Sequence, residues 1–116
     1  MSSVYLSGVP GAPQAPTAVD ILANSMKLLW KAPASDGGTP ITGYHVERRS
    51  NTSKHWVFLN KEPETDTSLL VKDLFEEMVY EFRVTAINKM GAGKPSPPSL
   101  PYVAKNPWSK SHAIFN

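Results

Sequence analysis

The sequence predicts an all-β fold in which about seven short strands form two antiparallel sheets packed face to face. Three observations lead to this prediction. Apolar and polar residues alternate with a period of two in the clearest segments. The 11 prolines and 7 glycines cluster between these segments and leave no room for a long helix. Short strands separated by turns, without helical patterns between them, are typical of a β-sandwich.

The strands are expected in seven segments. In chain order they are residues 18–23, 25–31, 44–49, 56–60, 67–72, 80–87 and 99–104. The second segment alternates cleanly, with Met26, Leu28 and Trp30 on one face and mostly polar residues on the other. The segments at 56–60 and 67–72 show weaker patterns, while the first and last segments simply complete the series.

The third and sixth segments carry the strongest alternation. Tyr44 and Val46 share one face of the third segment, and Tyr80, Phe82 and Val84 share one face of the sixth. Both segments are therefore predicted to be half-buried antiparallel strands. An odd number of strands that alternate in direction lets the chain enter at one pole and leave at the other, so such domains can be joined in series.

Size and composition favour one domain that folds unaided. A chain of 116 residues with 41% hydrophobic and 19% charged residues can bury one core but not two. The net charge of +2 comes from interspersed charges of both signs, so we expect neither nucleic acid nor a membrane as a partner. The absence of cysteine excludes disulfides and thiolate chemistry, and it fits a reducing cytoplasm.

Three residues carry a family resemblance. Trp30 in an early strand, with Leu74 and then Tyr80 six residues later, resembles the fibronectin type III family, whose fold is a seven-stranded immunoglobulin-like sandwich. The resemblance implies that Trp30 fills the centre of the core and that the Tyr80 hydroxyl bonds to nearby backbone. With Phe82 and Val84, these residues are the expected structural core.

Longer strings narrow the resemblance to the fibronectin type III domains of titin, twitchin and myosin-binding proteins. They are residues 32–33, 36–41, 43–48, 80–84 and 86–88, together with Trp56 and Asn60. One departure is Glu77, which stands where the family usually has glycine.

The resemblance also implies domain limits and a role. Residues 10–105 are expected to form the fibronectin type III domain, after an N-terminal tail or cloning-derived segment at 1–9 and before a C-terminal linker or tail at 106–116. The implied role is a structural and interaction module of a sarcomeric protein in the cytoplasm, in the A-band or M-band. Its expected partners are myosin or other sarcomeric components, and immunoglobulin or fibronectin type III neighbours in the same chain. A kinase domain elsewhere in the parent chain is compatible with this.

No catalytic, cofactor or metal site is expected. Gly91 to Lys94 superficially suggests a phosphate loop, but the motif needs glycine where Asn88 stands and a hydroxyl where Pro95 stands. The three histidines lack metal-ligand spacing. The amides of residues 36–38 could bind an anion, although a flexible turn is the favoured interpretation.

Two further features remain open as functional signals. Asn51 begins a glycosylation sequon, which would matter if the chain were an extracellular adhesion or receptor module instead. The second feature is a mixed-charge face on two neighbouring strands. Its residues are His45, Glu47, Arg49, Glu81 and Arg83. The favoured interpretation is a solvated face with weak cross-strand pairs, and the alternative is a surface that docks a filament protein.

Overall fold

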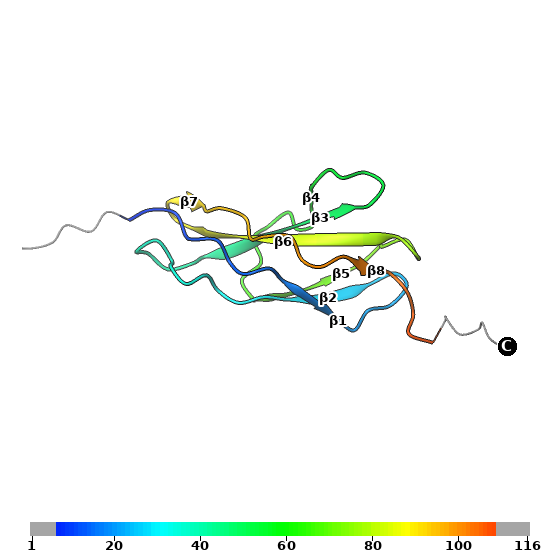
Figure 1. The fold of residues 1–116 in the computed structure, drawn as a ribbon. Helices are drawn as coiled ribbons and strands as arrows, with labels where there is room; N and C mark the ends of the chain where they lie inside the picture. Colours follow the sequence, from blue (N-terminus) through cyan, green and yellow to red (C-terminus); the bar gives the residue numbers. More distant parts are fainter. Residues whose placement is uncertain (1–6, 109–116) are drawn as a thin grey trace, which may run out of the picture.

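The computed structural model describes residues 7–108 as a sandwich of two β-sheets (Figure 1). Its strands are β1 (Thr17–Val19), β2 (Met26–Leu29), β3 (Gly43–Ser50), β4 (Val57–Phe58), β5 (Ser68–Val71), β6 (Val79–Asn88), β7 (Gly91–Ala92) and β8 (Tyr102–Val103). The predicted all-β sandwich is confirmed. Among the described residues, no helix is long and apolar enough to cross a bilayer.

The strands divide into a small and a large sheet, and every pairing is antiparallel. The small sheet has the order β1-β2-β5, and the large sheet has the order β4-β3-β6-β7, with β8 also paired to β6. The longest pairing joins β3 to β6, from Gly43 opposite Ile87 to Ser50 opposite Tyr80. This pairing places the two strands of the predicted mixed-charge face side by side.

The core lies between the sheets because alternate residues of each strand point inward. Its buried members are Met26, Leu28, Trp30, Tyr44, Val46, Val71, Leu74, Tyr80, Phe82, Val84, Ala86 and Ala104. This cluster contains the five residues that the sequence assigns to the core. Trp30 is only 6% exposed, and its ring meets the Tyr44 ring edge-on with centroids 5.6 Å apart. Burial also raises the pKa of the Tyr44 hydroxyl.

The Tyr80 side chain fixes the connection between β5 and β6. Its hydroxyl accepts a hydrogen bond from the Phe75 backbone N–H at 2.9 Å. Two residues beyond Phe75, Glu77 has a φ of 71°, so the backbone adopts the left-handed conformation despite the side chain. The Glu77 N–H donates to the Ala104 carbonyl at 2.7 Å, which ties this strained turn to the end of the domain.

Replacing Tyr80 with phenylalanine should lower the free energy of unfolding by about 1 kcal/mol, because it removes one hydrogen bond and keeps the ring. Urea denaturation measures this loss. Tyr102→Phe is the matched control, since the Tyr102 hydroxyl has no hydrogen bond within residues 7–108. Equal losses in the two variants would show that the hydroxyl of Tyr80 does not stabilise the turn.

The last edge of the large sheet is irregular rather than the single strand predicted at 99–104. The chain advances ten residues from Ala92 to Tyr102 while β6 advances seven from Ile87 to Tyr80, so three extra residues are accommodated as bulges. Prolines at 95, 97, 98 and 101 supply no N–H to this edge.

Two serine side chains compensate for the irregular edge. The Ser96 hydroxyl accepts from the Val84 N–H at 3.0 Å, and the Ser99 hydroxyl accepts from the Phe82 N–H at 3.0 Å. Each serine N–H also donates back to the carbonyl of the same β6 residue. The hydroxyls therefore satisfy donors on β6 that a regular partner strand would otherwise pair.

Hydrogen bonds extend beyond the predicted domain limits at both ends. Residues 7–9 were expected in a tail, yet Gly8 donates to the Gly37 carbonyl at 2.8 Å, and its carbonyl accepts from the Asn88 side chain at 2.8 Å. At the other end, the Asn106 side chain accepts from the Ala23 N–H at 2.9 Å. The remaining predicted tail residues, 1–6 and 109–116, lie outside the described residues.

The proline-containing segment at 10–16 is packed against the sandwich. Pro13 and Pro16 are fully buried, and Gly11 donates to the Ser35 carbonyl at 2.9 Å. This segment runs along the sandwich before β1 begins (Figure 1). The described chain enters at one pole of the sandwich and leaves at the other (Figure 1). The structure has eight strands, but β7 and β8 both run antiparallel to β6, so they count as one strand in the odd-strand argument.

Candidate partner surface

Four of the five predicted surface residues form two cross-strand pairs. In the β3–β6 register Glu47 lies opposite Arg83, and Arg49 lies opposite Glu81. Since opposite residues on one face of antiparallel strands are close, each pair can form an ion pair. The sign of the charge reverses along each strand and across the pairing, so each charge has a neighbour of opposite sign.

Both pairs are bonded in the structure. Arg49 Nε lies 2.7 Å from Glu81 Oε1, with both side chains about one third exposed. Arg83 Nε lies 2.8 Å from Glu47 Oε1, and Arg83 Nη2 lies 3.3 Å from Glu47 Oε2. The second pair is bidentate and the Glu47 side chain is only 11% exposed. The second pair is therefore the more strongly oriented of the two.

Trp56 joins the two pairs into one cluster. The Arg49 and Arg83 guanidinium carbons lie 4.5 Å and 4.4 Å from the centroid of its ring, within the range of cation–π contacts. We call Glu47, Arg49, Trp56, Glu81 and Arg83 the charged cluster. Trp56 carries part of the family resemblance, but the sequence pattern does not place it on this face. Its place follows from the β3–β4 register, which continues from Arg48 opposite Val57 and brings Trp56 beside Arg49.

The predicted cross-strand pairs are present, but part of the face that was expected to be solvated is buried. Glu47 is a buried residue at 9% exposure, and Thr85 on the same face is buried at 8%. The physical reason is that Trp56 lies across the arginines and covers part of the sheet. The solvent-facing surface is thus a stacked arginine–tryptophan layer rather than a row of independent charges.

His45 stands apart from the charged cluster. It pairs with Thr85 in the register, and its ring meets the Phe58 ring edge-on with centroids 5.1 Å apart. Its Nδ1 is buried without a hydrogen-bond partner within the described residues. The fifth predicted surface residue therefore belongs to an aromatic contact beside β4.

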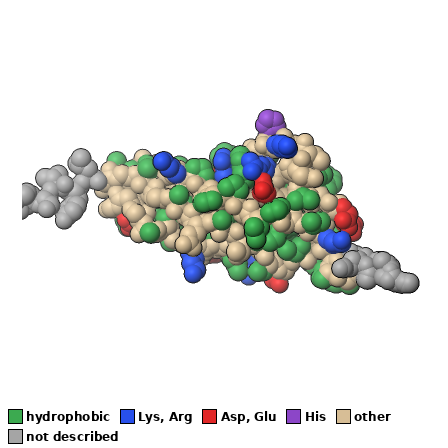
Figure 2. Space-filling model, in the orientation of Figure 1, with side chains coloured by type: hydrophobic (Ala, Val, Ile, Leu, Met, Phe, Trp, Pro, Cys, Tyr) green, Lys and Arg blue, Asp and Glu red, His purple; other side chains and the backbone are tan. Residues whose placement is uncertain are grey.

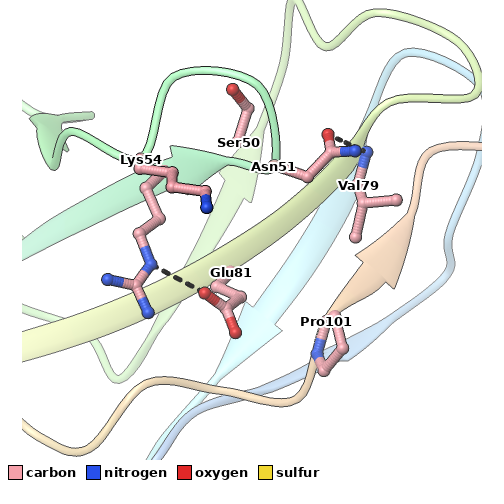
Figure 3. A pocket seen from close by; sticks show the side chains of 7 residues that line it. Ser50, Asn51, Lys54, Val79, Glu81 and Pro101 are labelled. Carbon is pink, nitrogen blue, oxygen red and sulfur yellow. Dashed lines mark hydrogen bonds and ion pairs between the residues drawn. The ribbon is translucent and has the colours of Figure 1, made fainter.

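A pocket of about 460 Å³ opens at the end of β3 beside the charged cluster (Figure 3). It is lined by Arg49, Ser50, Asn51, Lys54, Val79, Glu81 and Pro101. Figure 3 shows the ion pair with Glu81 at its rim. Asn51, the first residue of the sequon, is exposed here, and its side-chain oxygen accepts from the Val79 N–H at 3.4 Å. The pocket offers polar and cationic groups to a partner side chain.

The candidate phosphate loop and the candidate anion-binding turn both have structural roles. Gly91 and Ala92 pair with β6 as β7, so they do not form an anion-binding loop. The Gly38 amide is engaged by the Asp36 side chain at 2.8 Å, and the Gly37 amide is engaged by the Ser35 hydroxyl at 3.2 Å. Within residues 7–108 no three acidic, histidine or cysteine side chains are grouped to hold a metal ion.

Comparisons with known proteins agree on one kind of domain. A family model described as "Fibronectin type III domain" matches residues 11–101. Human cardiac-type myosin-binding protein C is 38% identical over 108 residues, which is 93% of this chain and 8% of that protein. Human myomesin-2 is 41% identical over 91 residues, which is 78% of this chain and 6% of that protein.

A solved structure gives the same result. The crystal structure of domains A168–A170 from titin matches with a TM-score of 0.80 at 40% identity, over 84% of this chain and 33% of that one. The chain therefore spans less than a tenth of the two curated relatives and about a third of the solved structure. These similarities concern one module within much longer proteins.

Proposed function

The chain belongs to the fibronectin type III family, and from that premise we propose that it spaces its neighbours and docks a thick-filament or M-band component in a modular sarcomeric protein. As a fibronectin type III module similar to domains of muscle structural proteins, it is non-catalytic. The proposed docking surface is the charged cluster, and the proposed partner is myosin or another sarcomeric protein.

The observation that carries the proposal is that the side chains of the charged cluster are held in one geometry. Isolated surface ion pairs contribute only about 0–1 kcal/mol, because holding two long side chains in one geometry costs entropy. Here two arginines are held by carboxylates and by one tryptophan ring, so a partner meets an already ordered surface. Tryptophan and arginine are also the residues most enriched among those that dominate binding energy.

The relatives support a sarcomeric partner. One of them is named a myosin-binding protein, and the solved structure that matches is part of titin. The entry and exit of the chain at opposite poles suit a module joined in series (Figure 1). A location in the A-band or M-band follows from the proposal.

The docking proposal can be tested by exchanging the charges of the more exposed pair. A variant with Arg49→Glu and Glu81→Arg keeps an opposite-charge pair and the net charge, and it inverts the local pattern. We expect its apparent affinity for filaments of purified striated-muscle myosin to fall at least about fivefold. The partner's charges that complement the natural pair would then face charges of their own sign. Co-sedimentation at several salt concentrations measures the affinity, and thermal unfolding by circular dichroism measures stability.

The matched control exchanges two exposed charges away from the cluster, by Lys94→Glu with Glu76→Lys. This control should bind as the natural chain does. Equal affinities for the two exchanged variants would show that the cluster is not the docking surface. A natural chain that fails to sediment with the filaments would contradict myosin as the partner.

Arg83 is left unchanged in the exchanged variant because its partner Glu47 is nearly buried. A glutamate at position 83 would face the nearly buried Glu47 carboxylate, and two like charges there would destabilise the fold. Reduced binding by a variant changed at Arg83 would then result from unfolding and not from the loss of a docking contact. Restricting the exchange to Arg49 and Glu81, whose side chains are about one third exposed, avoids this ambiguity.

The second candidate function is an extracellular module, and the exposed position of Asn51 favours it. The sequon lies in the turn that follows β3, where a glycan would meet solvent. Secretion of the chain from mammalian cells, followed by glycosidase treatment and mass measurement, detects a glycan at this residue. A glycan found there on the natural protein would support this candidate over the sarcomeric one.

A further inference from the structure

The sheet edges of this sandwich differ in how well they are protected from pairing with another chain. The edge formed by β7 and β8 is interrupted by bulges and prolines, and neither device permits regular pairing. The β4 edge has two residues and the β1 edge has three, so both are short templates. The β5 edge has four residues and contains no proline or bulge.

The free backbone groups of β5 can be assigned from its pairing with β2. The Trp30 N–H donates to the Thr67 carbonyl at 3.0 Å, so residue 67 and every second residue after it face β2. Ser68, Leu70 and Lys72 therefore direct their N–H and C=O groups outward. No strand of the described chain pairs with that side of β5.

Exposed apolar side chains gather beside this edge. Leu70 is 56% exposed on β5, and Val57 and Phe58 are 50% and 63% exposed on β4. All three line one groove of about 300 Å³ between the edges of the two sheets. Arg48, Lys72 and Asp73 bring charge to the same groove. An unprotected strand edge beside exposed apolar side chains is a template for strand addition.

We propose that the β5 edge is a self-association site, at which a second copy of this chain adds its own β5 antiparallel about a two-fold axis at Leu70. This inference goes beyond the proposed docking function and uses a different surface. With the axis at Leu70, Ser68 of each copy lies opposite Lys72 of the other, and Leu70 lies opposite its counterpart. All the outward N–H and C=O groups of these residues are then paired.

Charge complementarity selects a second copy as the occupant. Asp66 lies in the bend two residues before Ser68, so the proposed pairing brings it near Lys72 of the other copy, within reach of a long side chain. The two-fold axis repeats this contact, which gives two Lys72–Asp66 contacts. The same axis places the two grooves next to each other, so that Val57 and Phe58 of both copies are covered together. Two copies of β5 therefore match each other in residue pairing, in charge and in exposed apolar surface.

Sedimentation velocity of the 116-residue chain at increasing concentration tests the proposal. We expect reversible dimers, with amide chemical-shift changes confined to residues 57–58 and 66–73. Leu70→Pro should raise the dimer dissociation constant at least about tenfold, because proline removes an outward N–H from the centre of the pairing. The monomer should keep its fold, since that N–H does not bond to β2.

Charge exchange provides an independent readout. Lys72→Asp alone should weaken the dimer, and adding Asp66→Lys should restore it, because the contact is re-formed with reversed signs. Leu100→Lys is the matched control, because Leu100 is 72% exposed beside the proline-containing edge. A chain that stays monomeric up to about 1 mM, or a dimer that Leu100→Lys disrupts and Leu70→Pro does not, would overturn the proposal.

Discussion

Trp30→Ala is expected to abolish cooperative unfolding of the domain. Trp30 is 6% exposed and packs edge-on against Tyr44, so alanine would leave a large cavity between the sheets. Truncation of a buried tryptophan costs about 3–5 kcal/mol, and a small domain has only about 5–15 kcal/mol of stability in total. Thermal unfolding followed by near-ultraviolet circular dichroism should show a broad, shallow change in place of a sharp transition.

Trp30→Phe is the control for this result. It keeps an aromatic ring against Tyr44 and removes the Trp30 Nε1–H, which is buried without a hydrogen-bond partner within the described residues. Loss of a buried unpaired donor offsets part of the cavity cost. We expect this variant to unfold sharply at a lower temperature. A sharp transition in Trp30→Ala near that of the natural chain would contradict the central role of this side chain.

Gly93→Val is expected to detach the N-terminal segment from the sandwich. A Cβ at residue 93 would lie 2.1 Å from the Pro10 carbonyl oxygen and 2.9 Å from its carbonyl carbon, and both are backbone atoms. The segment must therefore move, and the hydrogen bonds from Gly8 to Gly37 and from Gly11 to Ser35 would be lost. The free energy of unfolding should fall by about 1–3 kcal/mol, as overpacking does in cores.

Amide hydrogen exchange distinguishes this local detachment from general destabilisation. The amides of Gly8 and Gly11 should exchange much faster in Gly93→Val, while those of β3 and β6 keep their protection. Gly8→Ala is the matched control, since a Cβ there would meet no atom within 4 Å. Unchanged protection of Gly8 and Gly11 in Gly93→Val would show that the close approach to Pro10 is not required.

Strand identity was accessible from the sequence wherever alternation was complete. The segments that contain β2, β3 and β6 were predicted because core residues recur at every second position, and a sandwich needs that period to bury one face. The prediction was weaker at the last strand. There three extra residues are accommodated, and the Ser96 and Ser99 hydroxyls bond to β6, so the edge has no period of two to detect.

The charged cluster, too, could be predicted only in part from the sequence. Its four charged residues were predicted to share a face, because alternation along two neighbouring strands determines on which side of the sheet each side chain lies. Their pairing depends on the register between β3 and β6, and the contribution of Trp56 depends on where β4 returns alongside β3. Neither register is encoded in a local pattern, because each is set by turn geometry and by packing of the two sheets.

The sequence by itself determined the fold class, the family and five of the twelve core residues, because these depend on local periodicity and on short family motifs. Only the tertiary structure decided that Gly8 and Asn106, outside the predicted limits of 10–105, are hydrogen-bonded to the folded body, and that the mixed-charge face is a stacked cluster with Trp56. It also decided that β5 is the edge left open. The physical reason is that each of these features arises from contacts between residues far apart in the chain, and their energies depend on register and burial rather than on composition.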